Sequence, residues 1–144
     1  STRSSRRWAT RERPMRFIYT GIEVKDMDQS IKFYTEGLGM ELLDRHPIPA
    51  TGGEVAGLKS KDSAQLLELN CYPNAKYRAG NELDHLAFEV DDVDQEINRL
   101  VHLGAKPARP TEVRPKYMVG FVSDPNGIWI ELFKERTSPT DRPD

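Results

Sequence analysis

The sequence predicts an α+β fold in which two βαβββ modules form curved mixed sheets around a groove. The first observation is an internal repeat, because residues 23–31 (EVKDMDQSI) recur as residues 89–97 (EVDDVDQEI), 66 positions later. The second is that Leu-Glu-Leu at 67–69 recurs as Ile-Glu-Leu at 130–132. The third is that both halves change at the same point from the two-residue periodicity of a strand to the spacing of a helix.

Length and composition favour a single domain whose partner is a small molecule. The chain has 144 residues and a formal net charge of −2, so neither nucleic acid nor an anionic membrane is expected to bind it. Its one cysteine, Cys71, cannot form a disulfide within the chain, which fits a reducing compartment. No apolar run approaches the ~20 residues of a membrane span. We therefore expect a cytoplasmic protein.

The ordered domain is expected to cover residues 15–135, with module one at 15–72 and module two at 83–135. Residues 1–14 hold five arginines against one acid, which predicts a disordered basic tail, with an organellar presequence as the alternative. Residues 136–144 are polar and contain proline, so a second flexible tail is expected there.

Module one is predicted to form a strand, a helix and three further strands. The helix should begin at Asp26, because Asp26 with Gln29 has the form of a capping box, and it should stop at Gly39. Alternating apolar residues predict strands at 17–24, 41–44, 54–59 and 64–71. The segment 46–53 is rich in proline and glycine, so it is expected to be a loop, either a lid or a connection.

Module two repeats this order. Its helix is predicted to begin at Asp92, where Gln95 completes a second capping-box pattern, and to stop at Gly104. Strands are predicted at 83–90, 118–123 and 128–133, with a weaker one after Ala105. The sequence Asp-Pro-Asn-Gly at 124–127 predicts a tight turn between the last two strands.

The repeat places four polar residues at matched positions. Tyr19 and His85 occupy the same place in the first strand of their modules. Glu68 and Glu131 occupy the same place in the last strand. Alternation puts the aliphatic residues of each last strand on one face, against the helix, and the glutamate on the opposite face. The four side chains are therefore expected on the faces that the helices leave open.

His85, Glu68 and Glu131 are the predicted ligands of one divalent metal ion. Glu131 alternates with Trp129 and Phe133, an apolar setting in which an unpaired carboxylate is costly, so it should be paired or bound to a metal. One histidine and two carboxylates suit Ni, Zn, Co, Mn, Mg or Fe and leave positions open for water and substrate. Taken singly, the histidine would be a hydrogen-bonded strand residue and each glutamate a solvent-facing one. Their coincidence at repeated positions favours the metal.

Three segments resemble glyoxalase I and related proteins of the vicinal oxygen chelate superfamily. They are residues 19–40 (YTGIEVKDMDQSIKFYTEGLGM), 84–90 (DHLAFEV) and 123–132 (SDPNGIWIEL). The resemblance extends from Met15 to about Lys134 and implies the paired-module fold. It also implies a homodimer, because two chains form the groove jointly in some relatives.

The resemblance implies that the metal is held at the positions of Tyr19, Glu68, His85 and Glu131. Tyr19 departs from the family, which usually has histidine or glutamine there. Because a phenol is a poor neutral ligand, Tyr19 is expected to bind substrate instead. Glu131 is the expected catalytic base, with Glu68 as the second choice.

A second departure concerns the thiol. Bacterial glyoxalase I has an arginine for the carboxylate of its thiol peptide four residues after the first ligand, and here that position is Glu23, of the opposite charge. Glu23 is therefore expected to contact a substrate that is not necessarily a glutathione adduct. Trp129 and Phe133 are the other expected substrate contacts, as aromatic walls of the groove.

The resemblance implies a metal-dependent lyase or isomerase of the glyoxalase I (lactoylglutathione lyase) type. Such an enzyme acts on a 2-oxoaldehyde–thiol adduct, or a similar small carbonyl substrate, through a metal-stabilised enediolate. Two alternatives remain open. One is an epimerase similar to methylmalonyl-coenzyme A epimerase, which uses the same enolate chemistry. The other is a metal-free drug-binding protein of the bleomycin resistance type.

Overall fold

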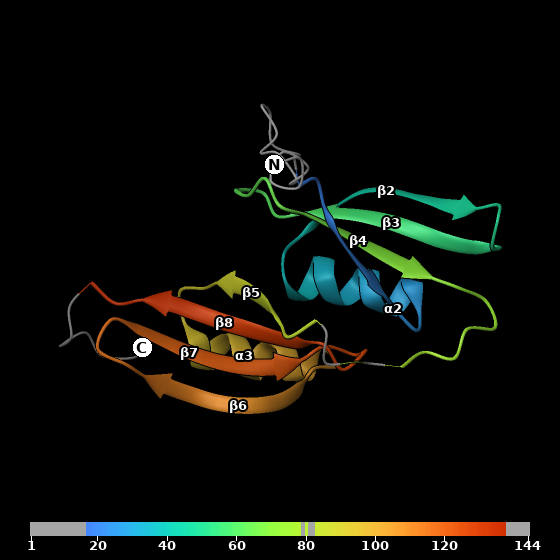
Figure 1. The fold of residues 1–144 in the computed structure, drawn as a ribbon. Coiled ribbons are helices and arrows are strands. Elements are labelled where there is room, and N and C mark those ends of the chain that lie inside the picture. The colour runs from blue at the N-terminus through green and yellow to red at the C-terminus, as the bar shows by residue number, and fades with distance from the viewer. Residues whose placement is uncertain (1–16, 79, 81–82, 138–144) are drawn as a thin grey trace, which may run out of the picture.

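Each half of the chain forms a strand, a helical segment and three further strands, in that order (Figure 1). The computed structural model describes residues 17–78, 80 and 83–137. Module one consists of β1 (Thr20–Glu23), α2 (Met27–Lys32), η1 (Phe33–Gly37), β2 (Glu41–Ile48), β3 (Gly53–Lys59) and β4 (Leu66–Cys71). Module two consists of β5 (Leu86–Glu89), α3 (Val93–His102), β6 (Lys106–Val113), β7 (Tyr117–Ser123) and β8 (Trp129–Glu135). The predicted α+β fold of two βαβββ modules is confirmed.

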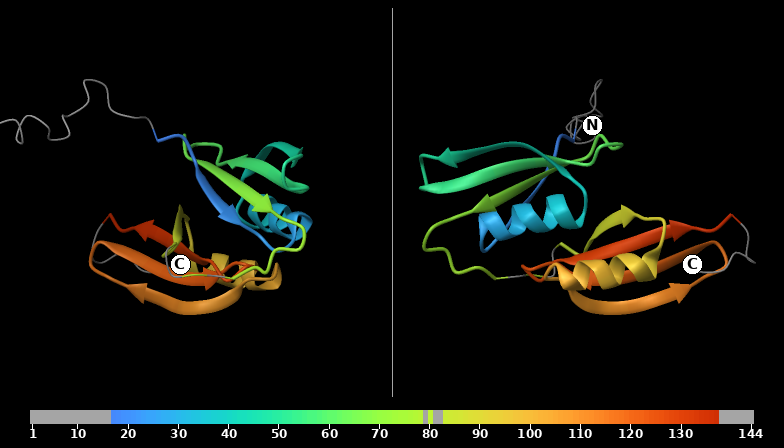
Figure 2. Two further views of the ribbon diagram at one scale, coloured as in Figure 1. Left: turned by 45° about the vertical axis from the view of Figure 1, so that its right-hand side comes forward. Right: turned by 180° about the vertical axis from the view of Figure 1, so that it is seen from behind.

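The two modules form separate sheets of the same design. The strand order is β1-β4-β3-β2 in the first sheet and β5-β8-β7-β6 in the second. The first and last strands of each module run parallel, and the other neighbours run antiparallel. Figure 2 shows each helix lying along one face of its own sheet. The opposite face of each sheet is thereby left open for the predicted site residues.

The edge strands β2 and β6 extend further than the sequence predicts. The loop predicted at 46–53 is wrong over half of its length, because β2 continues to Ile48 and β3 begins at Gly53, and only residues 49–52 form a turn. Pro47 is tolerated because β2 is an edge strand, where one row of N–H groups needs no partner. The weak strand after Ala105 is likewise the whole of β6, an edge strand that contains two prolines. By contrast, the first strand of each module begins about three residues later than predicted.

Both helical segments begin and end where the sequence predicts. The carboxylates of Asp26 and Asp92 each accept a hydrogen bond from the amide three residues later, at 2.9 and 3.0 Å. Gly39 and Gly104 adopt the left-handed backbone that commonly ends a helix, with φ of 73° and 106°. These stops turn the chain back so that the second strand of each module can form.

One hydrophobic core joins the two modules. The covered faces of β4 and β8 supply Leu69, Ile130 and Leu132, which are fully buried. Gly37, at the end of η1, lies so close to α3 that an added Cβ would be 3.2 Å from a methyl group of Leu100. The two helical segments therefore pack against each other, and the modules meet through them rather than through their open faces.

A buried polar cluster of Ser30, Tyr34, Asp124 and Asn126, here called the inter-module cluster, also joins the halves. Tyr34 Oη donates to Asp124 Oδ2 at 2.8 Å, and Asn126 Nδ2 donates to Ser30 Oγ at 3.0 Å. Asp124 Oδ1 accepts the amides of Asn126 and Ile128, both at 2.8 Å, which forms the predicted tight turn. The cluster thus fixes the turn before β8 to the helical segment of module one.

Replacing Tyr34 with phenylalanine is expected to lower the free energy of unfolding by about 1–3 kcal/mol, because Asp124 loses a buried donor. Burial, and then the charge of Asp124, raise the pKa of Tyr34 well above its usual value of 10. The folded chain therefore holds the phenol proton more tightly than the unfolded chain does. The stability that this proton contributes is complete below pH ~10 and is lost as the pH rises further.

Urea unfolding of both proteins at neutral pH and above about pH 10 measures this effect. In the phenylalanine variant, the alkaline loss of stability should shrink to the part contributed by Tyr77 and Cys71, whose pKa values are also raised by burial. Equal alkaline slopes in the two proteins would contradict the role assigned to Tyr34.

The two predicted tails lie largely beyond the described residues. Residues 1–14 and 138–144 are outside them. Arg136, at the start of the predicted C-terminal tail, is held in place, because its amide donates to Lys116 O at 2.8 Å and its Nη1 donates to Arg114 O at 2.6 Å.

Over the ranges that the structure describes, no helix has the length and apolar character needed to cross a bilayer.

Candidate functional site

The open face of the second sheet carries the site residues predicted in module two. Along β8, Ile130 and Leu132 are fully buried, while Glu131 points to the opposite face and stays partly exposed. Phe121 of β7 pairs directly with Glu131 in the sheet, so the two side chains share this face. The alternation predicted from the sequence therefore holds, and it places Glu131 next to an aromatic ring.

His85 lies just before β5 and turns toward Glu131. Its Nε2 is 3.4 Å from Glu131 Oε1, and its Nδ1 is 2.6 Å from Asp84 Oδ2. The ring packs edge-on against Phe121, with centroids 5.7 Å apart. In its neutral form the imidazole donates Nδ1–H to Asp84, which leaves the lone pair of Nε2 facing the Glu131 carboxylate. Both atoms are electron-pair donors, so a metal ion placed between them would be bound by both.

This pair of donors fits a divalent metal. An imidazole nitrogen and a carboxylate oxygen are common ligands of the metals expected from the sequence. The Asp84 carboxylate on the other ring nitrogen fixes the tautomer and orientation that ligation by Nε2 requires. The side chains of His85 and Glu131 are 34% and 22% exposed, so water and substrate could reach a metal ion held there.

The open face of the first sheet carries a matching pair, Tyr19 and Glu68. A Cβ added to Gly21 would lie 3.9 Å from the Tyr19 ring and 4.0 Å from Glu68 Oε1, so both side chains lie beside Gly21. Glu68 Oε1 also accepts a hydrogen bond from Asn70 Nδ2 at 3.2 Å. The strand register around this pair is repeated at His85 in the second sheet, so the internal repeat extends to the site.

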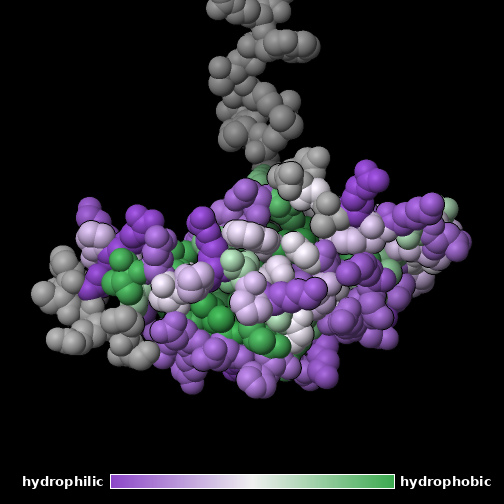
Figure 3. All heavy atoms as spheres, turned by 90° about the horizontal axis from the view of Figure 1, so that it is seen from below, coloured by the Kyte–Doolittle hydropathy of each residue, from purple (hydrophilic) through white to green (hydrophobic). Residues whose placement is uncertain are grey.

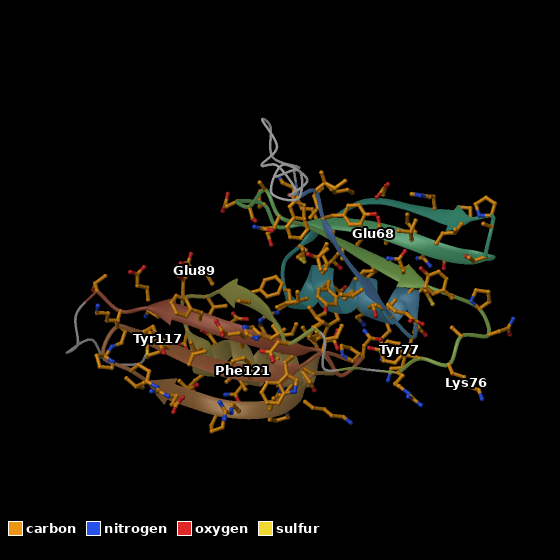
Figure 4. All side chains as sticks on the ribbon, viewed as in Figure 1. Glu68, Lys76, Tyr77, Glu89, Tyr117 and Phe121 are labelled. Carbon is orange, nitrogen blue, oxygen red and sulfur yellow. The ribbon has the colours of Figure 1, made fainter. Side chains whose placement is uncertain are left out.

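The two pairs do not meet within one chain. Glu68 lies on the first sheet, whereas Phe121 accompanies His85 on the second, and Figure 4 shows the two labelled residues well apart. Within residues 17–78, 80 and 83–137, no three histidine, cysteine, aspartate or glutamate side chains are grouped closely enough to hold a metal ion. Of the three ligands predicted from the sequence, one chain brings His85 and Glu131 together and leaves Glu68 apart.

A groove of about 690 Å³ opens beside His85. Its walls include Glu23, Tyr77, Arg78, Arg109, Phe121 and Trp129. Glu23 and Trp129, both predicted to contact substrate, therefore line the same groove. Phe133, the third such prediction, lies further along β8 and is stacked on Tyr117, with ring centroids 5.5 Å apart.

Several residues of the groove escape prediction from the sequence, among them Asp84, Phe121 and Arg109. Phe121 could have been found, because alternation along β7 puts it on the face that Glu131 occupies once the two strands are paired. Asp84 gives no signal, since its hydrogen bond depends on how the backbone turns before β5. Arg109 lies on β6, whose prolines hide the alternation that would have placed it.

Large apolar side chains are exposed near the site residue Tyr19. Phe17, Ile18 and Tyr19 are 82%, 54% and 44% exposed, and Trp129 of the other sheet is 40% exposed. Seen from below, the molecule shows several hydrophobic areas within a largely hydrophilic surface (Figure 3). Consecutive exposed side chains of this size form an apolar surface of the kind found at protein contacts.

Comparison with known sequences gives the family. The model of the Glyoxalase/Bleomycin resistance protein/Dioxygenase superfamily matches residues 16–132. A lactoylglutathione lyase of Neisseria meningitidis is 31% identical over 130 residues, which cover 85% of this chain and 93% of that protein. A probable chloroplastic lactoylglutathione lyase of Arabidopsis thaliana is 36% identical over 129 residues, which cover 86% of this chain. The match covers 37% of the plant protein, so the chain spans little more than a third of that relative.

Solved structures agree with this result. Glyoxalase I of Leishmania major, described as trypanothione-dependent, superposes with a TM-score of 0.72 at 30% identity, over 84% of this chain and 87% of that one. Glyoxalase I of Zea mays superposes with a TM-score of 0.71 at 28% identity, over 90% of this chain and 45% of that one. Because the family model covers most of the sequence and the two-module fold agrees with it, the chain belongs to the glyoxalase/bleomycin resistance protein/dioxygenase superfamily.

Proposed function

We propose that the chain is a metal-dependent lyase or isomerase of glyoxalase I type, which acts on a 2-oxoaldehyde–thiol adduct or a similar small carbonyl compound. The proposal rests above all on the 3.4 Å approach of His85 Nε2 to Glu131 Oε1 beside a groove large enough for such a substrate. Relatives of similar sequence are named lactoylglutathione lyases, which supports the same class of reaction.

Glu131 is the proposed base. Its carboxylate takes a proton from the substrate carbon next to the carbonyl and returns it to the neighbouring carbon. Asp84 holds His85 in one tautomer, so that Nε2 keeps its lone pair directed at the site. A divalent metal held by His85 and Glu131 would supply the Lewis acidity that stabilises negative charge on the substrate oxygens. Phe121 and Trp129, with centroids 5.4 Å apart, limit the access of water from one side.

We also propose that a second copy of the chain completes the site in a homodimer. One chain supplies His85 and Glu131, and the other supplies Glu68 and Tyr19. The equivalent positions of the two pairs in a repeated fold, together with their separation within one chain, support this arrangement. The exposed segment that begins at Phe17 offers an apolar surface for such a contact.

Turnover of methylglyoxal with glutathione tests the reaction. Protein stripped by a chelator should be inactive, and reloading with Ni, Zn, Co, Mn, Mg or Fe should restore turnover with at least one metal. Other thiols belong in the same assay, because Glu23 places a negative charge in the groove. Epimerisation of a coenzyme A thioester would favour the epimerase instead. Tight binding of drug-like compounds without metal or turnover would favour the binding protein.

Two inactive variants test whether the site is shared. Glu68→Gln and Glu131→Gln should each lack turnover when assayed alone. In a mixed dimer, one site holds both substitutions and the other holds neither, so an equimolar mixture that is unfolded and refolded together should recover about a quarter of the wild-type activity. Recovery of none would mean that each site is built from a single chain.

A further inference from the structure

Tyr77, labelled in Figure 4, attaches the linker between the modules, residues 72–85, to module two. Tyr77 is partly buried, whereas the other residues of 72–78 are exposed. Its Oη donates a hydrogen bond to Asn126 O at 2.9 Å, in the turn before β8. Lys25 Nζ lies 5.7 Å from the centroid of the Tyr77 ring, within the range of a cation–π contact. The ring is therefore held both at its hydroxyl and on its face.

The hydrogen bond of Tyr77 is present at neutral pH, and its acceptor is fixed. Burial raises the pKa of Tyr77 above its usual value of 10, and the negative charges of Asp124 and Glu23 raise it further. The phenol therefore keeps its proton and remains a donor. Asn126 is buried and its Nδ2 donates to Ser30 Oγ at 3.0 Å, so the acceptor belongs to the inter-module cluster.

The tethered ring forms part of the wall of the groove beside His85. Tyr77 lines this groove together with residues 127–129, which follow directly after its acceptor Asn126. Tyr77 therefore lies at the end of the groove where β8 begins, and Glu131 lies further along that strand. A ring that is held at two points cannot turn aside for a bulky ligand without losing both contacts.

We propose that Tyr77 is a specificity-determining residue, whose ring limits the size of the uncharged group that the substrate carries on its carbonyl carbon. The proposal rests on the proposed function for the position of the reacting carbons, at His85 and Glu131. Glu23 lines the same groove, close enough to Tyr77 for its charge to raise the pKa of the phenol. A thiol that carries carboxylates is repelled from Glu23, so the uncharged substituent of the carbonyl compound lies against Tyr77 instead.

The adducts of methylglyoxal and phenylglyoxal with one thiol test this limit, because they differ only in a methyl or a phenyl group. Turnover by the full chain, loaded with the metal that supports it best, gives kcat/KM for each adduct. Tyr77→Ala should raise the ratio of the phenyl to the methyl value by at least about tenfold, because the wall against the larger group is removed. Tyr77→Phe keeps the ring without its hydrogen bond, so the ratio should rise by only about two- to threefold. This second variant decides the matter if the alanine variant does not fold.

Tyr72→Ala is the matched control, because Tyr72 is an exposed tyrosine of the same linker and lies outside the lining of the groove. Its ratio should stay within about twofold of the wild type. A general loss of stability lowers both rates and leaves their ratio unchanged, so the ratio reports the wall and not the fold. A wild-type ratio in folded Tyr77→Ala would overturn the proposal.

Fluorescence quenching of Trp129 measures the size limit without any turnover. Trp129 lines the same groove, and Trp8→Phe removes the other of the two tryptophans in the chain. Acrylamide is a small neutral quencher, and the nitroxide TEMPO is a bulky neutral one. In this background Tyr77→Ala should raise the quenching constant of TEMPO, relative to that of acrylamide, by about twofold, because the end of the groove is opened. Tyr72→Ala should leave the relative constant unchanged.

The two measurements separate this inference from the proposed function. A chain that converts neither adduct with any thiol, but in which Tyr77→Ala raises the relative TEMPO quenching, would keep the size limit and refute the lyase. A chain that converts both adducts with equal ratios in the wild type and Tyr77→Ala would keep the lyase and refute the role of Tyr77. Unchanged quenching in a chain without turnover would refute both.

Discussion

Replacing Glu131 with glutamine is expected to lower kcat/KM for the thiol adduct by a factor of at least about 1,000 and to leave the fold intact. The amide keeps the size of the side chain and its place beside His85, but it cannot take up the substrate proton. It also lacks the negative charge that helps to hold a divalent metal. The measurement is steady-state turnover by metal-loaded protein, with the metal content of each sample determined separately.

Glu135→Gln provides the control for this change. Glu135 lies on the same face of β8, four residues further along, and is exposed, so the loss of its charge should leave turnover within about twofold of the wild type. Metal content distinguishes the role of Glu131 as a metal ligand from its role as the base. A variant that retains its metal but has no turnover has lost only the base. If the Glu131→Gln protein turned over substrate at the wild-type rate, Glu131 would not be the base, and Glu68 would be the next candidate.

Replacing Asp124 with alanine is expected to lower the free energy of unfolding by about 3–5 kcal/mol. The carboxylate accepts hydrogen bonds from Tyr34 Oη and from the amides of Asn126 and Ile128. Asp124 is 2% exposed, so water cannot take the place of the lost acceptor for these three donors. Urea denaturation followed by far-UV circular dichroism measures the loss.

Asp62→Ala is the matched control, because Asp62 is an exposed aspartate in the corresponding turn of module one, before β4. Its removal should change the free energy of unfolding by less than about 0.5 kcal/mol. If the two substitutions cost the same, the inter-module cluster would contribute nothing to holding the halves together.

The fold was predictable because its signals are local and occur twice. The caps at Asp26 and Asp92 and the stops at Gly39 and Gly104 each depend on a few neighbouring residues, and the repeat supplied every signal in duplicate. The edge strands β2 and β6 were underestimated for an equally physical reason. A proline argues against a strand only where the sheet needs an N–H donor at that position, and the sequence does not show which strand lies at the edge.

The site was predictable as pairs and not as a whole. The two-residue period of a strand determines that Glu131 shares the open face with His85, and the structure brings these two side chains to 3.4 Å. Whether Glu68 joins them depends on how the modules are placed relative to each other. That placement is set by the contact of Gly37 with Leu100 and by the buried hydrogen bonds of Asp124, which connect residues far apart in the chain. No pattern within either module contains this information.

The inter-module cluster also restricts how the two halves can diverge during evolution. Ser30 and Tyr34 belong to one half, and Asp124 and Asn126 belong to the other. A change at one position therefore leaves a buried donor or acceptor in the opposite half without its hydrogen-bond partner. Mutations at these four sites are therefore coupled rather than additive. In related chains, a substitution at one of these positions in module one should be accompanied by a substitution at its hydrogen-bond partner in module two. The two halves must therefore change together at these positions.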